Sequence, residues 1–166
     1  MVFKMGFEYQ KLRNEDNQIA VYPFSSATKS MTTLVRDGQK VYAFNKGAPD
    51  FVLENCKYYL DEKGQRQEID EKYKKTLQEK LREFADGTLR TLLLACRDAE
   101  DCNKTTDIKQ VTNNLTVQCM VGIKDPIREE IPESVRKCHV AGVRVRMITG
   151  DNQSTAIAIA KEAGIL

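Results

Sequence analysis

The sequence predicts an α+β fold in two parts: an antiparallel sheet with helices, followed by a β-α-β-α segment. Two β-rich runs that flank the turn signal Asp37-Gly38 indicate a hairpin in the first part. Beyond residue 114, apolar runs alternate with helical patterns, which is typical of parallel strands joined by right-handed crossovers. We therefore expect the boundary between the parts to lie between Thr116 and Asp125.

Strands are expected early in the chain. The run Ile19–Phe24 is strand-like, and Ser30–Arg36 and Lys40–Asn45 are rich in β-branched and aromatic residues. The glycine of the intervening turn tolerates the positive φ that a tight hairpin needs, so these last two runs should pair antiparallel. A short helix is expected from Pro49 to about Cys56, because a proline loses no hydrogen bond in the first turn of a helix.

The clearest helix lies in the middle of the chain, and Gly87 closes it as a C-terminal cap. The run Leu89–Arg97 that follows is too short for an independent helix and is expected to be a buried strand. The segment "YYLDEKGQRQEI" and the stretch Asp98–Asn114 are polar and are expected to be loops. The apolar residues of the helix recur at spacings of four and three, which puts them on one face: Ile69, Tyr73, Leu77, Leu81 and Phe84.

The second part begins with the apolar run "LTVQCMVGI", which is expected to be a strand. The segment "DPIREEIPESVRKCHVAG" is expected to be a helix that ends at Gly142. A second strand is expected over Val143–Ile148, and the segment "STAIAIAKEAG" has the pattern of a second helix.

The composition disfavours several classes of protein. A net charge of +2 over 166 residues, with acidic and basic side chains interleaved, disfavours a nucleic-acid partner. No apolar run approaches the roughly 18–20 residues that a membrane span needs. The five cysteines form no C-x-x-C pair and His139 is the single histidine, so we expect reduced thiols and no metal site.

The string "RMITGD" at residues 146–151 has the local order strand, tight turn, helix start. Backbone N–H groups at the start of a helix favour an anion, and Thr149 adds a hydroxyl donor. Ligands of open α/β sheets bind at this end of the strands. Asp151 could order a metal or a ribose near phosphates, or it could be a helix cap beside a tight turn at Gly150. Both interpretations remain open at this point.

The first part contains a second set of candidate residues. In "NKGAPD", Lys46 leaves a strand and Gly47 lets a backbone approach a ligand closely; the alternative is a surface turn. In "FSSATKSM", an aromatic ring, a lysine and a methionine stand close together, which would suit a purine and a phosphate; the alternative is a phenylalanine and a methionine of the core. Arg90 could reach a phosphate or form a surface ion pair.

The order of these motifs is more specific than any one of them. "VYPFSSATKSMTTLV", "KGAPD", "DGTLRTLLLACRD" and "GIKDPIREEIPESVRKCHVAGVRVRMITGDN" follow one another as they do in the P-type cation pumps. Together with the opening "GFEYQKLRNE", the chain most resembles the calcium-pumping ATPases of the plasma-membrane subgroup over essentially its whole length. The sarcoplasmic-reticulum type and a vacuolar member of the same subgroup are the nearest competitors.

The resemblance implies a nucleotide-binding domain over residues 1–118 and part of a phosphorylation domain of the haloacid-dehalogenase type over 119–166, with a hinge at 123–128. Phe24 would stack on adenine, Lys29 and Met31 would line the same pocket, and Arg90 would contact the phosphates. The remaining residues that the resemblance implicates are Lys46 and Gly47 for nucleotide contact, Asp125, Pro126 and Arg128 for the hinge, and Thr149, Gly150 and Asp151 for the phosphate-side loop.

The resemblance also implies a function. The intact pump would use ATP with Mg²⁺, form an aspartyl phosphate, export calcium from the cytosol, and sit in the plasma membrane or an internal membrane. The D-K-T-G-T and G-D-G-x-N-D motifs of the family do not occur here, so no catalytic residue and no Mg²⁺ ligand is expected on this chain. Its partners would be ATP and the rest of the pump, and calmodulin would act outside the chain.

Two departures from the family pattern and three alternatives complete the expectations. Ser26 stands where the sarcoplasmic-reticulum type has an arginine, and Asp50 replaces a usual glutamate while keeping the negative charge. The alternatives are a pump for another cation, a nucleotide-binding or interaction module without catalysis, and a free phosphatase. The phosphatase would need a D-x-D-x-T-type strand, which is absent from the sequence.

Overall fold

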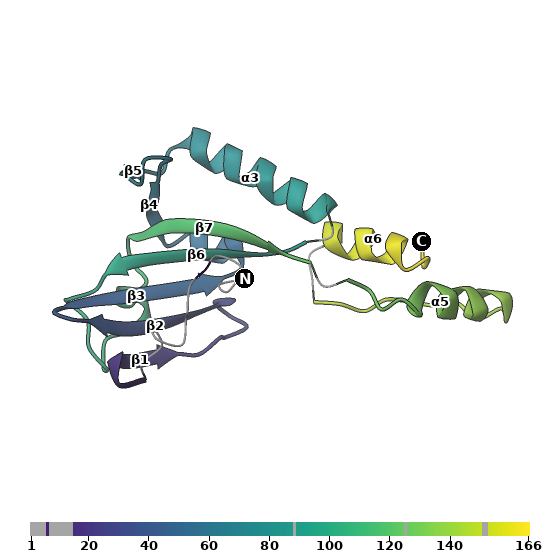
Figure 1. Cartoon of the computed structure of the whole chain (residues 1–166), viewed down its shortest axis with the longest axis horizontal. Coiled ribbons are helices and arrows are strands. Elements are labelled where there is room, and N and C mark those ends of the chain that lie inside the picture. The colour runs from purple at the N-terminus through teal and green to yellow at the C-terminus, as the bar shows by residue number, and fades with distance from the viewer. Residues whose placement is uncertain (1–5, 7–14, 88, 125, 151–152) are drawn as a thin grey trace. The chain divides into compact units, whose positions relative to one another are not determined.

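The computed structural model describes residue 6 and residues 15–87, 89–124, 126–150 and 153–166. They form a mixed α+β structure with a seven-stranded sheet in the order β1-β2-β3-β6-β7-β4-β5 (Figure 1). The strands are β1 (Gln18–Tyr22), β2 (Ser30–Asp37), β3 (Lys40–Gly47), β4 (Cys56–Leu60), β5 (Arg66–Glu68), β6 (Arg90–Asp98) and β7 (Leu115–Ile123). The helices are the short 3-10 helix η2 (Glu15–Asn17), α2 (Pro49–Leu53), α3 (Glu71–Asp86), α4 (Ile108–Val111), α5 (Ile131–Val140) and α6 (Gln153–Glu162).

The chain divides into two compact units, which are described separately. The first comprises residues 1–69 and 93–119 and holds most of the sheet; the second comprises 70–92 and 120–166 and holds α3, α5 and α6. The predicted domain division at 118/119 and the hinge over 123–128 remain predictions. None of the helices in the described part of the chain combines the length and hydropathy that a membrane span requires.

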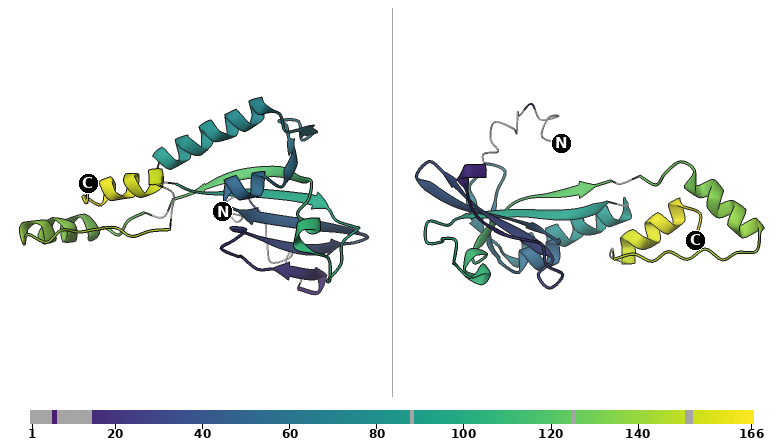
Figure 2. Two further views of the ribbon diagram at one scale, coloured as in Figure 1. Left: turned by 180° about the vertical axis from the view of Figure 1, so that it is seen from behind. Right: turned by 90° about the horizontal axis from the view of Figure 1, so that it is seen from below.

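The predicted hairpin is confirmed. β2 pairs antiparallel with β3 from Ser30↔Gly47 to Asp37↔Lys40, and Gly38 adopts a φ of +59° in the turn. β1 adds to the other edge of β2, also antiparallel, and these strands lie side by side in both views of Figure 2.

One face of the hairpin builds the core of the first unit. Along β3, buried and more exposed residues alternate: Val41 and Ala43 are buried, whereas Phe44 and Lys46 are exposed. The buried side chains cluster with residues from the β6–β7 connection, and full burial of a leucine side chain contributes about 1.5–3 kcal/mol. The cluster consists of Leu34, Val41, Ala43, Ala99, Cys102 and Val111.

The connection from β6 to β7, expected to be a loop, contains the short helix α4 and is held by Arg97. The Arg97 guanidinium donates hydrogen bonds to the carbonyl oxygens of Val111 (3.1 Å) and Gln110 (3.2 Å). It also pairs with Asp101, and hydrogen bonding to Arg97 lowers the pKa of that carboxyl. Arg97 therefore closes the C-terminal end of α4 onto β6 and fixes the path by which the chain enters β7.

The segment "YYLDEKGQRQEI" differs from expectation, because it forms a hairpin rather than a turn alone. β4 and β5 pair antiparallel around Asp61, whose Oδ1 accepts hydrogen bonds from the backbone N–H groups of Lys63 and Gln65. β4 also pairs in parallel with β7, so the sheet is mixed rather than purely antiparallel. All residues of β5 are exposed, which leaves no alternation for a sequence pattern to reveal.

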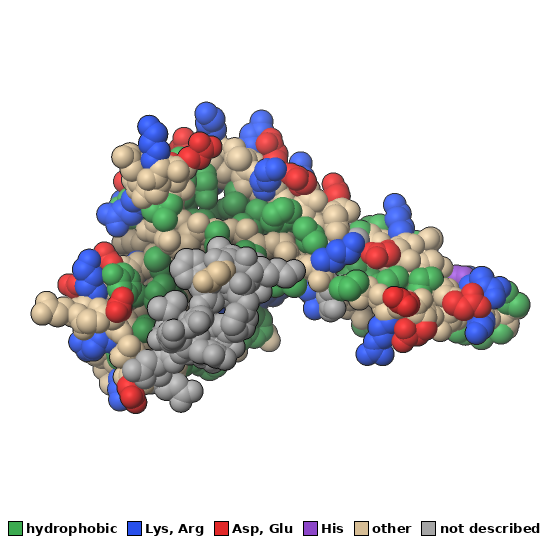
Figure 3. Space-filling model, viewed as in Figure 1, with side chains coloured by type: hydrophobic (Ala, Val, Ile, Leu, Met, Phe, Trp, Pro, Cys, Tyr) green, Lys and Arg blue, Asp and Glu red, His purple; other side chains and the backbone are tan. Residues whose placement is uncertain are grey.

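In the second unit, α3 agrees with the prediction. Asp70 caps its start by accepting a hydrogen bond from Tyr73 N (2.7 Å), Gly87 caps its end, and Leu77 is buried. Its exposed side carries the ion pairs Lys74–Glu71 and Lys80–Glu83. On the face drawn in Figure 3, the blue and red side chains of the described residues are interspersed.

The strand expected over Val143–Ile148 is not formed. This segment is extended but carries no strand assignment, and Ile148 is 98% exposed. A strand exists only when its backbone groups pair with a neighbouring strand. The described residues of the second unit supply no such neighbour to this segment. α5 also begins later than expected, at Ile131 with Pro132 in its first turn.

Gly47 sits where the chain entering β2 crosses closely over the end of β3. Ala48 N donates to Lys29 O (2.9 Å) at this crossing. A Cβ at position 47 would collide with Lys29 O and would lie 2.5 Å from Ser30 Cβ and 2.6 Å from Ser30 Cα. Two of these atoms belong to the backbone, so a side chain could be accommodated only by moving β2 away from β3.

We predict that Gly47→Ala lowers the free energy of unfolding by about 1–3 kcal/mol, as overpacking of a close-packed site does. Urea denaturation followed by circular dichroism measures the change. Gly87→Ala is the matched control, because a Cβ there meets its nearest atoms at 3.5 Å, an ordinary contact distance. Equal stability of the two variants would contradict the proposed crossing of the strands.

Candidate functional site

The candidate site is a hollow of about 340 Å³ in the first unit, on the face of the sheet opposite the core. Strands β2, β3, β6 and β7 contribute its walls and floor. The lining residues are Met31, Thr33, Phe44, Asn45, Lys46, Leu94, Ala95 and Gln118.

Strand register places the side chains of the hollow together. Met31 lies directly opposite Lys46, and Lys46 lies directly opposite Leu94. Directly opposite residues project to the same face of a sheet, so these three form one row across β2, β3 and β6. Phe44 precedes Lys46 by two residues and therefore projects to the same face, where its side chain is 49% exposed.

The chemistry of the hollow combines an apolar slot with one positive charge. Met31, Phe44 and Leu94 supply apolar surface, and Lys46 is the cationic side chain among the described lining residues. The ring of Phe44 lies 6.0 Å from that of Tyr42 at an interplanar angle of 36°. Such a slot can hold a flat apolar group with an anion near the lysine.

Beneath the hollow, Asn45 projects to the opposite, core side of β3. Its Nδ2 donates a hydrogen bond to Thr32 Oγ1 (2.8 Å), and both side chains are buried. Asn45 Oδ1 has no hydrogen-bond partner among the described residues. This buried pair is a polar link between β2 and β3 directly under the row that carries Met31 and Lys46.

Sequence reasoning anticipated some of these residues and missed others. Met31 and Lys46 were both expected to bind a ligand, and the structure brings them together in the hollow. Phe44 and Gln118 were not expected. The two-residue spacing of Phe44 from Lys46 on one strand could have indicated the first, whereas no local pattern connects Gln118 to the hollow.

The other expected residues of the first unit lie elsewhere. Phe24 is 63% exposed in the segment between β1 and β2 and does not line the hollow. Lys29, whose φ is +44°, places its Nζ 5.1 Å from the centre of the Phe51 ring, a cation–π distance. Gly47 is buried at the end of β3. The nucleotide contacts expected of these residues remain predictions.

The expected residues of the second unit are dispersed along it. Arg90 is exposed at the start of β6, and Thr149 and Gly150 are exposed before α6. Arg128 lies before α5 and accepts a hydrogen bond from Ile131 N through its carbonyl oxygen (3.0 Å), and Pro126 is exposed. Asp125 and Asp151 lie outside the described residues.

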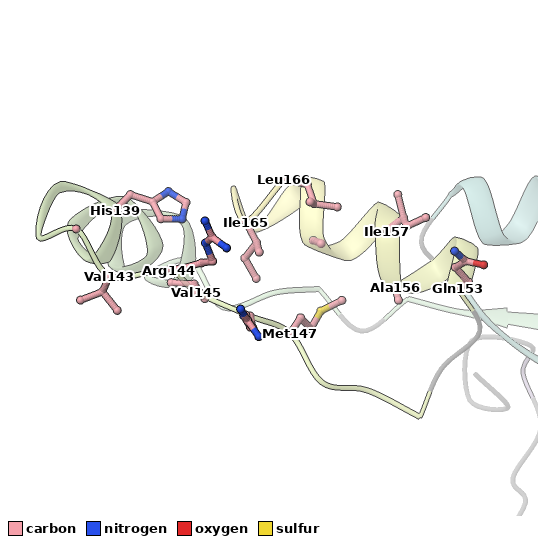
Figure 4. Close-up of a pocket in the computed structure, with 13 residues that line it drawn as sticks. His139, Val143, Arg144, Val145, Met147, Gln153, Ala156, Ile157, Ile165 and Leu166 are labelled. Atoms are coloured by element: carbon pink, nitrogen blue, oxygen red, sulfur yellow. The ribbon is translucent and has the colours of Figure 1, made fainter.

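The second unit has a larger hollow of about 810 Å³ between the extended segment and α6. Figure 4 shows Met147 and Ile165 directed into the space between the two elements. The lining is mostly apolar, and among the described residues no group of three His, Cys, Asp or Glu side chains is placed to hold a metal ion. The described lining residues therefore suggest no catalytic or metal-binding role for this hollow.

The cysteines of the first unit are poor nucleophiles. Burial raises the pKa of Cys56 to about 12, and burial together with Asp98 raises the pKa of Cys96. Only the thiolate attacks, so these thiols are unreactive near neutral pH. Neither thiol lines the hollow.

Comparisons with known proteins give one consistent relationship. A family model described as "P-type ATPase, cytoplasmic domain N" matches residues 1–130. A calcium-transporting ATPase PAT1 of Dictyostelium discoideum is 44% identical over 164 residues, which cover 97% of this chain and 14% of the relative. Plasma membrane calcium-transporting ATPase 4 of Homo sapiens is 39% identical, with 96% and 13% covered.

A plant relative has the same identity to this chain as the human protein. The putative plasma membrane-type calcium-transporting ATPase 11 of Arabidopsis thaliana is 39% identical over 163 residues, which cover 98% of this chain and 16% of the relative. The chain therefore spans only 13% to 16% of the length of these three relatives.

The polar link beneath the site gives a prediction about stability. We expect Thr32→Val to lower the free energy of unfolding by about 1–3 kcal/mol, because it leaves the buried Asn45 amide without its acceptor. The double variant Thr32→Val, Asn45→Val should recover most of that loss, since it removes both polar partners.

Urea denaturation of Thr32→Val, of Asn45→Val and of the double variant measures this coupling. Thr33→Val is the matched control, because Thr33 is the next residue of β2 and projects to the other face. It should change the free energy of unfolding by less than about 0.5 kcal/mol. Strictly additive effects of the two substitutions would show that the Thr32–Asn45 link is not formed.

Proposed function

The chain belongs to the P-type cation-transporting ATPases and is similar to calcium-transporting members of that family. From this premise, we propose that it supplies the nucleotide-binding part of a calcium pump. In that pump, ATP hydrolysis proceeds through an aspartyl phosphate and drives calcium out of the cytosol. The plasma membrane is the proposed location, because several of the relatives are named for it.

The row Met31–Lys46–Leu94 with Phe44 beside it is the observation that carries this proposal. A purine is flat and apolar on its faces, which suits a slot between Met31 and the Phe44 ring. The triphosphate is strongly anionic, which suits the Lys46 ammonium at the same hollow. One ligand therefore satisfies both the apolar walls and the charge.

The role of this chain is to bind and orient the nucleotide. Phosphoryl transfer depends mainly on positioning and on electrostatic stabilisation. Lys46 offsets part of the phosphate charge, and Arg90 is proposed to provide a second cation as the resemblance implies. Mg²⁺ would arrive on the triphosphate oxygens, because this ion is usually held by substrate phosphates and one or two carboxylates.

The second part of the proposal concerns residues 119–166. They would form a β-α-β-α slice of a haloacid-dehalogenase-like phosphorylation domain, joined to the nucleotide-binding domain of residues 1–118 through Asp125, Pro126 and Arg128. The loop from Thr149 to Asp151 would face the phosphoryl group. The string D-K-T-G-T is absent from the 166 residues, so the phosphorylated aspartate would belong to another segment of the pump.

The partners follow from this arrangement. They are ATP and the remaining phosphorylation, actuator and transmembrane domains of the same pump, with calmodulin acting, where it acts, outside these residues. The two α-helices beyond the sheet, α5 and α6, and the apolar run in the extended segment between them agree with a slice of a larger α/β domain.

We predict that the chain binds ATP and that Lys46→Ala weakens binding at least about tenfold, which corresponds to about 1.4 kcal/mol. An ATP titration followed by backbone amide NMR shifts measures this affinity. The shifts should cluster at Met31, Phe44, Lys46 and Leu94.

The matched control is Lys40→Ala, which removes an exposed lysine from the opposite end of the same strand. It should leave ATP affinity within about twofold of the original, because its charge lies far from the hollow along β3. Shifts confined to Thr149 and Gly150, or equal losses from both lysine variants, would remove the hollow from consideration as the nucleotide site.

A further inference from the structure

Gln118 stands at the far side of the hollow from Met31. It is an exposed residue of β7, and β7 is the neighbour of β6 in the sheet. Lys46 on β3 and Gln118 on β7 are thus separated by the single strand that carries Leu94, which corresponds to about 10 Å between their backbones. A ligand held in the slot would present one end to Lys46 and one edge to Gln118.

The orientation of the Gln118 amide is set by its own strand. Its Nε2 donates a hydrogen bond to the carbonyl oxygen of Thr116, at 3.3 Å. The amide oxygen lies on the other side of the planar group from the nitrogen, so anchoring Nε2 to the strand turns Oε1 away from it. That bond uses one of the two Nε2 protons, and Oε1 is the acceptor that Gln118 offers to an N–H group of a ligand.

The other polar side chains of the lining are less suited to distinguish an amino group from a carbonyl on a base. The Thr33 hydroxyl is both donor and acceptor and rotates to suit its partner. The Asn45 amide is turned to the core and bonded to Thr32. Lys46 donates only, and its flexible ammonium is suited to phosphate charge rather than to a base edge.

We propose that Gln118 is a specificity-determining residue that selects purines with an amino group at position six over purines with a carbonyl there. The selection rests on the nucleotide site proposed above. Adenine presents an N–H donor to Oε1, whereas hypoxanthine and guanine present a second acceptor oxygen to it. Two facing acceptors form no hydrogen bond with each other, so the nucleotide with a carbonyl at position six loses the contact that adenine makes.

The test compares ATP with ITP, because the two nucleotides differ in the substituent at position six and the associated ring proton. Dissociation constants for both are measured by NMR titration of the 166-residue chain and of its variants. The original chain should bind ATP about tenfold more tightly than ITP, a difference of about 1.4 kcal/mol. In Gln118→Leu, ATP affinity should fall to within about twofold of an unchanged ITP affinity.

Two further variants make the result specific. Gln118→Glu keeps an acceptor oxygen at this position and should keep the preference for ATP over ITP, although both nucleotides would bind more weakly near a carboxylate. Gln78→Leu removes an exposed glutamine of α3 that does not line the hollow, and it should leave the ratio of the two dissociation constants unchanged.

Each outcome separates the two proposals. If Gln118→Leu keeps the original ratio while Lys46→Ala weakens ATP binding as predicted, Gln118 does not recognise the base and the nucleotide site itself stands. If the original chain binds neither nucleotide, the proposed function fails and this inference fails with it. A ratio that collapses in Gln118→Leu and persists in Gln118→Glu supports the assignment.

Discussion

The register of β2 on β3 is the constraint on which the site depends. With Met31 opposite Lys46 and Thr33 opposite Phe44, one set of side chains projects to the hollow and the alternate set enters the core. A slip of one residue would turn the alternate side chains of one strand to the other face, burying Lys46 if β3 slipped or exposing Leu34 if β2 slipped. Because burying an unpaired ammonium and exposing a core leucine are both unfavourable, the packing of the core and the composition of the site enforce the same register.

This division of the sheet has a consequence for energetics. The core face is covered and contributes stability, whereas the other face leaves Phe44 half exposed and carries a lysine among apolar neighbours. Apolar surface left open in this way contributes little to folding and is available to a ligand. The Thr32–Asn45 hydrogen bond links β2 and β3 beneath the hollow, and Arg97 holds the end of α4 onto β6.

Local patterns were sufficient for elements whose signal is local. The hairpin at Gly38 and the helix α3 follow from a turn signal, a cap and periodicity, and the family resemblance added Met31 and Lys46 as ligand residues. The β4–β5 hairpin could not be predicted, because all residues of β5 are exposed and show no alternation of buried and exposed positions. The place of Gln118 in the hollow could not be predicted, because it depends on the position of β7 beside β6. Strand order is a long-range property that local sequence patterns do not reveal. The local pattern of Val143–Ile148 and its place between two helical segments predict a strand, but a strand also requires a partner.

Gly47 and Lys46 belong to the same motif, but substitutions of the two residues test different properties of the protein. Its absence of a side chain is explained by the crossing of Lys29 and Ser30, without any contact to a nucleotide. A larger residue there would displace β2, and with it Met31, from the row that faces the ligand. Loss of binding in a Gly47 variant would therefore report on strand pairing rather than on recognition. Lys46, one residue earlier and exposed on the opposite face, can be changed without disturbing that crossing, so its substitution reports on the ligand directly.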